Sequence, residues 1–163
     1  MAIIIGQKAP DFTLYDSDKN KISLSNFVGK NVVLLFFPQA FTSVCTKELC
    51  EVRDNMVMYN DINTQVLAIS VDSLFTLAKF KELQQLNFPL LSDFNKEVST
   101  AYGCIYETFV FDMKGVSKRS AFVIDATGTI KYAEILENAP DTPNFNAITE
   151  TLAALEDTKT SKI

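Results

Sequence analysis

The stretch Asn31-Val-Val-Leu-Leu-Phe-Phe37, followed at once by Pro38-Gln-Ala-Phe-Thr-Ser-Val-Cys45, decides how the chain is organised. Its first part is mainly β-branched, aliphatic and aromatic, and a proline ends it, which predicts a buried central strand. After a short loop, apolar residues recur at helical spacing, and they are Cys45, Leu49, Val52, Met56 and Tyr59. This spacing predicts one helix whose buried face carries Cys45.

The pattern also places Cys45 in the first turn of that helix, because Thr42 or Ser43 can serve as its N-cap. Unpaired backbone N–H groups and the positive end of the helix dipole favour an anion there, and a thiolate is such an anion. A helix N-terminus with a nearby cation lowers the pKa of a cysteine from about 8.5 by several units. A helical cysteine is also often a small buried hydrophobe, and spacing alone leaves both interpretations open.

Three other residues give Cys45 a specific setting. Pro38, Thr42 and Cys45 stand as P-x-x-x-T-x-x-C directly after the predicted strand, and Arg119 opens the later segment Arg119-Ser-Ala-Phe-Val-Ile-Asp125. Together they resemble the active site of the peroxiredoxins, and the similarity extends from residues 6–12 to the last predicted helix. It implies that Cys45 is the peroxidatic nucleophile and that Pro38 shields it. It also implies that Thr42 hydrogen-bonds the peroxide and that Arg119 stabilises the thiolate and the transition state.

The resemblance also suggests roles for two residues further along the helix. Cys50 gives the C-x4-C spacing of the Q-type (bacterioferritin-comigratory) branch, in which the second cysteine resolves the sulfenic acid. The run Phe-Phe-Pro-x-Ala-Phe-Thr and the segment Leu-Leu-Ser-Asp-Phe94 also resemble the E-type alkyl hydroperoxide reductases, which commonly work with one cysteine. Glu48 is expected to orient Arg119, although a glutamate in a first helical turn is favourable in any protein. Cys104 matches no family role and is expected to be a buried structural thiol.

Periodicity along the rest of the chain predicts strands that alternate with helices. The predicted elements are a β-hairpin over residues 11–23, strands over 65–71, 119–125 and 129–135, a short turn or edge segment over 90–93, and helices from Asp72 or Ser73 to about Leu86, over 95–102 and over 144–155. This order predicts an α/β protein with a mixed central sheet flanked by helices and an N-terminal β-hairpin. The resemblance implies the thioredoxin fold of peroxiredoxin type. One domain over residues 1–163 is expected, with a frayed tail from about residue 156.

Residues 103–118 show no clean period, although several of them are aromatic or aliphatic. Loops of this length without structure are uncommon unless they are functional. The segment is therefore either an interface or pocket wall, or a loop folded back over the sheet, and the sequence leaves both open. Aromatic residues around Phe41 and at Phe109 and Phe111 favour a homodimer through these loops.

The composition excludes several classes of function. The chain has 163 residues and a formal net charge of -5, which argues against a nucleic-acid or anionic membrane surface. Its apolar runs are too short for a signal peptide or a membrane span, so a cytoplasmic protein is expected. The absence of histidine excludes a Cys-His nucleophile pair and histidine-ligated metal sites. No metal and no cofactor are expected.

Two functions from different classes remain. The favoured one is a thiol-dependent peroxidase that reduces hydrogen peroxide and organic hydroperoxides through a Cys45 sulfenic acid. Cys50 would resolve that acid as an intramolecular disulfide, and a thioredoxin-like or other thiol donor would re-reduce it. The alternative is a redox-sensing or holdase-like binding protein on the same scaffold. A thioredoxin-type disulfide reductase is disfavoured because the chain has no C-x-x-C motif.

Overall fold

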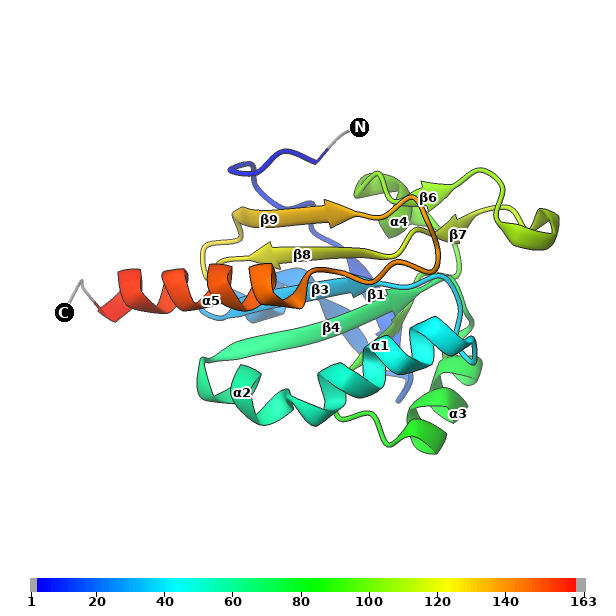
Figure 1. The fold of residues 1–163 in the computed structure, drawn as a ribbon, viewed down its shortest axis with the longest axis horizontal. Helices are drawn as coiled ribbons and strands as arrows, with labels where there is room; N and C mark the ends of the chain where they lie inside the picture. Colours follow the sequence, from blue (N-terminus) through cyan, green and yellow to red (C-terminus); the bar gives the residue numbers. More distant parts are fainter. Residues whose placement is uncertain (1–2, 161–163) are drawn as a thin grey trace.

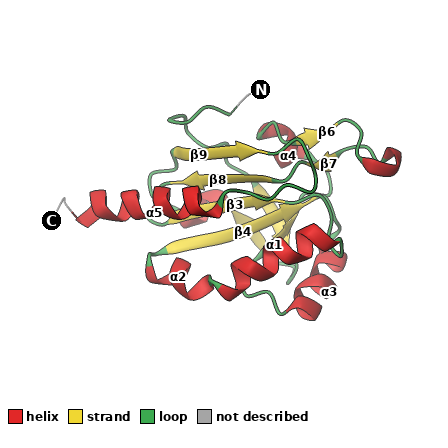
Figure 2. Ribbon diagram, viewed as in Figure 1, coloured by secondary structure: helices red, strands yellow, loops and turns green. Residues whose placement is uncertain are grey.

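A computed structural model describes residues 3–160, and its centre is a seven-stranded mixed sheet (Figures 1 and 2). In sheet order the strands are β2 (Lys21–Ser23), β1 (Thr13–Asp16), β5 (Leu90–Ser92), β4 (Thr64–Ser70), β3 (Asn31–Phe36), β8 (Ser120–Ile124) and β9 (Ile130–Ile135). Strand β4 pairs in parallel with β3 and β5, while the remaining pairs are antiparallel. The α/β class, the mixed sheet and the N-terminal hairpin β1–β2 are thus confirmed.

Helices and loops cover both faces of the sheet. The helices are α1 (Ser43–Asp54), α2 (Met56–Asp61), α3 (Leu74–Gln84), α4 (Glu97–Ala101) and α5 (Phe145–Thr160), with a 3-10 turn η1 (Leu24–Phe27). Val33 and Leu35 of β3 pack in one core cluster with α1, α2, α3 and α5, whereas Val32 and Leu34 pack in a second cluster with η1 and α4. Both faces of β3 are therefore buried, which explains its unbroken apolar sequence. Figure 1 shows α1, α2 and α5 together on the near face.

The helix that carries Cys45 is shorter than predicted. It ends at Asp54, and Asn55 separates it from α2, although the whole predicted apolar face from Cys45 to Tyr59 is buried. Asn55 donates from its side chain to the Glu51 carbonyl at 2.8 Å, while its backbone N–H bonds to Val52 at 3.0 Å. In a continuing helix the backbone N–H of Asn55 would bond to the Glu51 carbonyl. The Asn55 side chain takes that carbonyl instead, and the helix ends there.

Other boundaries also differ from the prediction. Residues 90–93 were expected to be a turn or an edge segment, but β5 lies between β1 and β4 inside the sheet. Helix α4 is shorter than the predicted 95–102, and α5 continues past residue 155 to Thr160. Residues 161–163 of the expected frayed tail lie outside the described part. No helix within residues 3–160 has the length and apolar character needed to cross a membrane.

Residues 103–118 form a small hairpin of their own. Strand β6 (Ile105–Tyr106) pairs with β7 (Val116–Ser117), and a 3-10 turn, η2 (Val110–Asp112), lies between them. Its Phe111 has a φ of 58° and a side chain that is 93% exposed. Two-residue strands are too short to produce a period in the sequence, which explains why the pattern did not reveal them.

Candidate active site

Cys45 lies in the first turn of α1, as predicted, and its side chain is buried. Thr42 is the N-cap residue, with φ of −91° and ψ of 153°. Its hydroxyl accepts no backbone N–H of the helix, and it donates to the Gln39 carbonyl at 2.8 Å. Thr42 therefore lies at the N-cap position, as the sequence allowed, but its side chain does not form the expected capping hydrogen bond.

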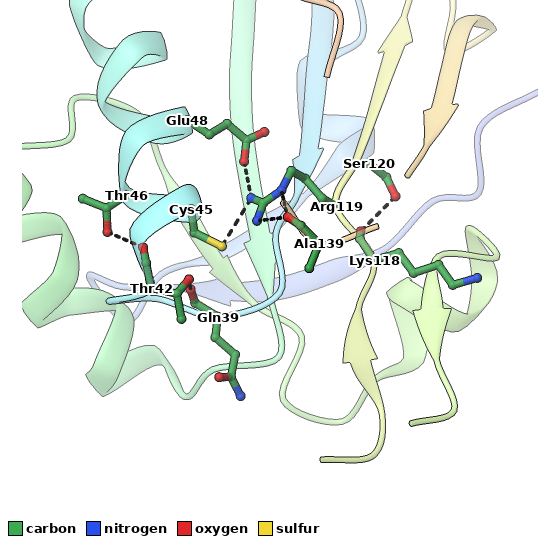
Figure 3. A network of polar contacts seen from close by, with 9 residues as sticks. All are labelled: Gln39, Thr42, Cys45, Thr46, Glu48, Lys118, Arg119, Ser120 and Ala139. Atoms are coloured by element: carbon green, nitrogen blue, oxygen red, sulfur yellow. Dashed lines mark hydrogen bonds and ion pairs between the residues drawn. The ribbon is translucent and has the colours of Figure 1, made fainter. Parts of the chain in front are cut away.

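The guanidinium of Arg119 joins three parts of the chain around the sulfur (Figure 3). Its Nη1 donates to Cys45 Sγ at 3.3 Å and to Glu48 Oε1 at 2.8 Å. Its Nε and Nη2 donate to the Ala139 carbonyl at 3.3 and 3.1 Å. Arg119 directly precedes β8 and its side chain is only 2% exposed. Because the guanidinium is planar and rigid, these contacts fix its position relative to both α1 and the loop before α5.

Glu48 is the buried partner of Arg119. It is the sixth residue of α1, so it lies in the second turn, and the expected benefit of a first-turn glutamate does not apply. Burial raises the pKa of the Glu48 carboxyl to about 7, against the opposing attraction of Arg119. Its Oε2 is buried and has no hydrogen-bond partner among residues 3–160. Glu48 therefore titrates near neutral pH while it shares one guanidinium nitrogen with Cys45.

Pro38 and Thr42 bound the loop that joins the central strand to the helix. Pro38 is buried two residues beyond the end of β3, and Thr42 is exposed directly before α1. Between them Phe41 has a φ of 68°, a left-handed conformation that non-glycine residues rarely adopt. The loop thus connects β3 to the first turn of α1 in a specific, constrained shape.

The other two cysteines do not contact this cluster. Cys50 is half-buried and donates from Sγ to Gln84 Oε1 of α3 at 3.5 Å, so it faces a different element from Cys45. Cys104 is fully buried in the core cluster on the opposite face of the sheet, and burial raises the pKa of its thiol to about 12. All three are free thiols in the structure. The prediction that Cys104 is buried is confirmed.

Ala139 is a member of this cluster that sequence reasoning missed. Its carbonyl accepts two hydrogen bonds from Arg119. A backbone carbonyl leaves no trace in the identity of its residue, so the sequence contained no signal for this contact. The structure therefore assembles Cys45, Glu48 and Arg119 in one hydrogen-bonded group and completes it with a main-chain oxygen.

Comparisons with known proteins identify the family of the chain. The AhpC/TSA family profile matches residues 5–133. Alkyl hydroperoxide reductase E of Mycobacterium tuberculosis is 38% identical over 154 residues, which cover 93% of this chain and 97% of that protein. The crystal structure of Peroxidoxin BcpB from Mycobacterium tuberculosis matches with a TM-score of 0.79 at 30% identity, over 94% of this chain and 96% of that one.

A second solved structure supports the predicted fold. The reduced 2-Cys peroxiredoxin of Plasmodium vivax matches with a TM-score of 0.84 at 26% identity, over 97% of this chain and 84% of that one. The mixed sheet and its helices thus form the thioredoxin-like fold of the peroxiredoxins. The chain belongs to the AhpC/TSA family and is a peroxiredoxin, a thiol-dependent hydroperoxide reductase.

Proposed function

We propose that Cys45 is the peroxidatic cysteine, and that it reduces hydrogen peroxide and organic hydroperoxides. The observation that carries this assignment is the 3.3 Å contact between Arg119 Nη1 and Cys45 Sγ, because a guanidinium that donates to the sulfur is placed to stabilise the charges of the reaction. The thiolate attacks one oxygen of the O–O bond and becomes a sulfenic acid. The second oxygen takes a proton and leaves as water or an alcohol.

We assign peroxide binding to Thr42. Its hydroxyl uses its one hydrogen to bond the Gln39 carbonyl at 2.8 Å, so its oxygen remains available as an acceptor. That oxygen can accept the O–H of a hydroperoxide and orient it toward Cys45. Pro38 then shields the sulfur from bulk water, and Arg119 stabilises the charge on the departing oxygen. Glu48 orients the guanidinium through its 2.8 Å hydrogen bond.

We infer that Cys50 resolves the sulfenic acid, as in the Q-type branch. Its thiolate attacks Cys45 Sγ, a disulfide forms, and the hydroxyl oxygen leaves as water. A thioredoxin-like or other dithiol donor then reduces the disulfide by exchange and is itself oxidised. In the competing one-cysteine cycle, the donor attacks the sulfenic acid of Cys45 directly and Cys50 is not required.

Resolution by Cys50 requires part of α1 to unwind. Five helical residues separate the two Cα atoms by roughly 8.6 Å and their side chains by about 140° around the axis. A disulfide needs Cα atoms within about 7 Å and converging Cβ atoms. The missing Thr42 side-chain cap favours opening of the first turns. The last turn is held by Arg53, whose Nη1 donates to the Gln84 carbonyl at 2.6 Å. We therefore expect unwinding over residues 43–50 only.

One equivalent of hydrogen peroxide is expected to join Cys45 to Cys50. Trypsin cleaves after Lys47, so the two cysteines fall in separate peptides, and mass spectrometry should find these peptides linked only in the oxidised protein. Amide exchange over residues 43–50 should be faster in the oxidised protein than in the reduced one. In Cys50→Ser, dimedone should trap a sulfenic acid on the Cys45 peptide.

Cys104→Ala is the matched control and should form the same linked peptides. A sulfenic acid on another cysteine would refute the assignment of Cys45. Normal turnover of Cys50→Ser with a thioredoxin-type donor would establish the one-cysteine cycle. A linked pair with unchanged amide exchange would contradict the unwinding step.

We also propose a homodimer through the loops that carry Phe41 and Phe111. Phe41 is 51% exposed and makes an edge-to-face contact with Phe80, with ring centroids 5.1 Å apart, while Phe111 is 93% exposed. Exposed aromatic side chains of this kind are typical interface anchors. Light scattering at micromolar concentration should give the mass of two chains, and Phe111→Asp should give the mass of one. Val57→Asp, at an exposed position on α2, should remain a dimer.

A further inference from the structure

Asp72, two residues beyond the end of β4, holds the loop that leads to Cys45. The sequence predicts Asp72 or Ser73 as the cap of α3, and Ser73 fills that role by accepting the Thr76 N–H at 3.2 Å. The Asp72 carboxylate is thereby free for other contacts. Its Oδ2 accepts the backbone N–H of Ala40 at 2.8 Å and the hydroxyl of Ser70 at 2.7 Å.

Asp72 is itself fixed by the sheet. Its backbone N–H donates to the Ser70 hydroxyl at 3.1 Å, and its carbonyl accepts the Ser92 hydroxyl at 2.6 Å. Ser70 ends β4 and Ser92 ends β5, so two parallel strands hold the main chain of Asp72 in place. A carboxylate that accepts a backbone N–H forms a strong, charge-assisted hydrogen bond. Asp72 therefore links the backbone of Ala40 to the ends of two strands of the sheet.

The loop needs such support because its conformation is unusual. Phe41 is in the left-handed region, next to Ala40, and its ring packs on Phe80. A bulky residue keeps this conformation only where surrounding contacts impose it. Asp72 accepts the backbone N–H of Ala40, which precedes Phe41. The hydroxyl of Thr42, which follows Phe41, donates to the Gln39 carbonyl. Together the two contacts hold the loop at Ala40 and at Thr42, the two neighbours of Phe41.

We propose that Asp72 is a positioning residue for the peroxide step, because it sets the loop that presents Pro38 and Thr42 to the substrate. The inference rests on the peroxide-binding role proposed above for Thr42. The Arg119 contacts to Cys45 and Glu48 do not pass through this loop. Loss of the Asp72 contact therefore slows the reaction with peroxide while the thiolate remains reactive toward other electrophiles.

Two substitutions separate the geometry of this carboxylate from its charge. Asp72→Asn keeps an acceptor oxygen in place and removes the charge, whereas Asp72→Glu keeps the charge and moves the oxygens by one methylene. Competition with horseradish peroxidase for hydrogen peroxide gives the rate of Cys45 oxidation. We expect Asp72→Glu to slow it by about 10- to 100-fold, as misplacement by about 1 Å does, and Asp72→Asn to slow it less than about threefold. Alkylation of Cys45 by iodoacetamide, followed on its tryptic peptide, should proceed at the wild-type rate in both.

Several results would overturn the proposal. They are a wild-type peroxide rate in Asp72→Glu, an equal loss in both reactions, or an Asp72→Asn variant as slow as Asp72→Glu. If Asp72→Glu does not fold, Ser92→Ala must show the same selective loss of peroxide rate, at a smaller size, or the proposal fails. Failure of wild-type Cys45 to react with peroxide would instead refute the proposed function, so the two failures are distinguishable.

Discussion

Arg119→Lys is expected to slow the oxidation of Cys45 by hydrogen peroxide about 100-fold, although the positive charge is kept. Arg119 reaches Cys45, Glu48 and Ala139 at once through three nitrogens. Lysine has one nitrogen on a flexible stem and cannot reproduce this fork. Loss of one donor to a developing oxyanion costs roughly 100- to 1,000-fold in other enzymes. Competition kinetics with horseradish peroxidase measures the effect.

The chain offers a matched control for this change. Arg53 is its other arginine, and its guanidinium bonds Asp54 and the Gln84 carbonyl, away from the sulfur of Cys45. Arg53→Lys should therefore oxidise at the wild-type rate. An unchanged rate in Arg119→Lys would show that the directed hydrogen bonds of Arg119 do not contribute to the reaction and that only its positive charge does.

Glu48→Gln is expected to remove a pH dependence of about 3 kcal/mol from the free energy of unfolding. The pKa of Glu48 is raised from 4.5 to about 7 in the folded protein, so folding favours its protonated form. A group with a raised pKa contributes its full stabilisation below pH 4.5 and loses it as the pH rises through 7. A rise of this size corresponds to about 3 kcal/mol. The wild type should therefore lose stability relative to Glu48→Gln between pH 4.5 and pH 8.

Denaturant unfolding followed by circular dichroism at several pH values gives this difference. Any constant offset from weakening the Arg119 pair cancels, because only the slope with pH is compared. Glu150→Gln, at an exposed position on α5, leaves Glu48 intact, so its free energy of unfolding should differ from that of the wild type by the same amount at every pH. Parallel stability curves for wild type and Glu48→Gln would mean that the carboxyl does not titrate in this range.

Much of the site could be predicted because it is local. The apolar run of β3, the proline that follows it and the helical spacing after Cys45 all lie within 30 residues, and each has a physical signature of its own. Arg119 is 74 positions from Cys45. No periodicity links residues so far apart, and only the family resemblance predicted their contact.

The features that were missed are short or non-local. A three-residue strand such as β5 cannot display an alternation, so its place inside the sheet was not evident. Asn55 breaks the helix through a side-chain hydrogen bond that competes with a favourable apolar pattern. Asp72 did have a usable signal, because it follows a buried parallel strand and the carboxyl ends of such strands meet at one edge of a sheet.

The position of Cys104 limits which intramolecular disulfides repeated oxidation can form. Three cysteines permit three intramolecular pairings, and the seven-stranded sheet separates Cys104 from the face that carries Cys45 and Cys50. Its raised pKa also keeps it a neutral thiol, which does not attack disulfides. One pairing remains, that of Cys45 with Cys50. With Cys50 as the resolving residue, disulfide isomers cannot accumulate, and each reduction returns the same starting protein without a reshuffling step.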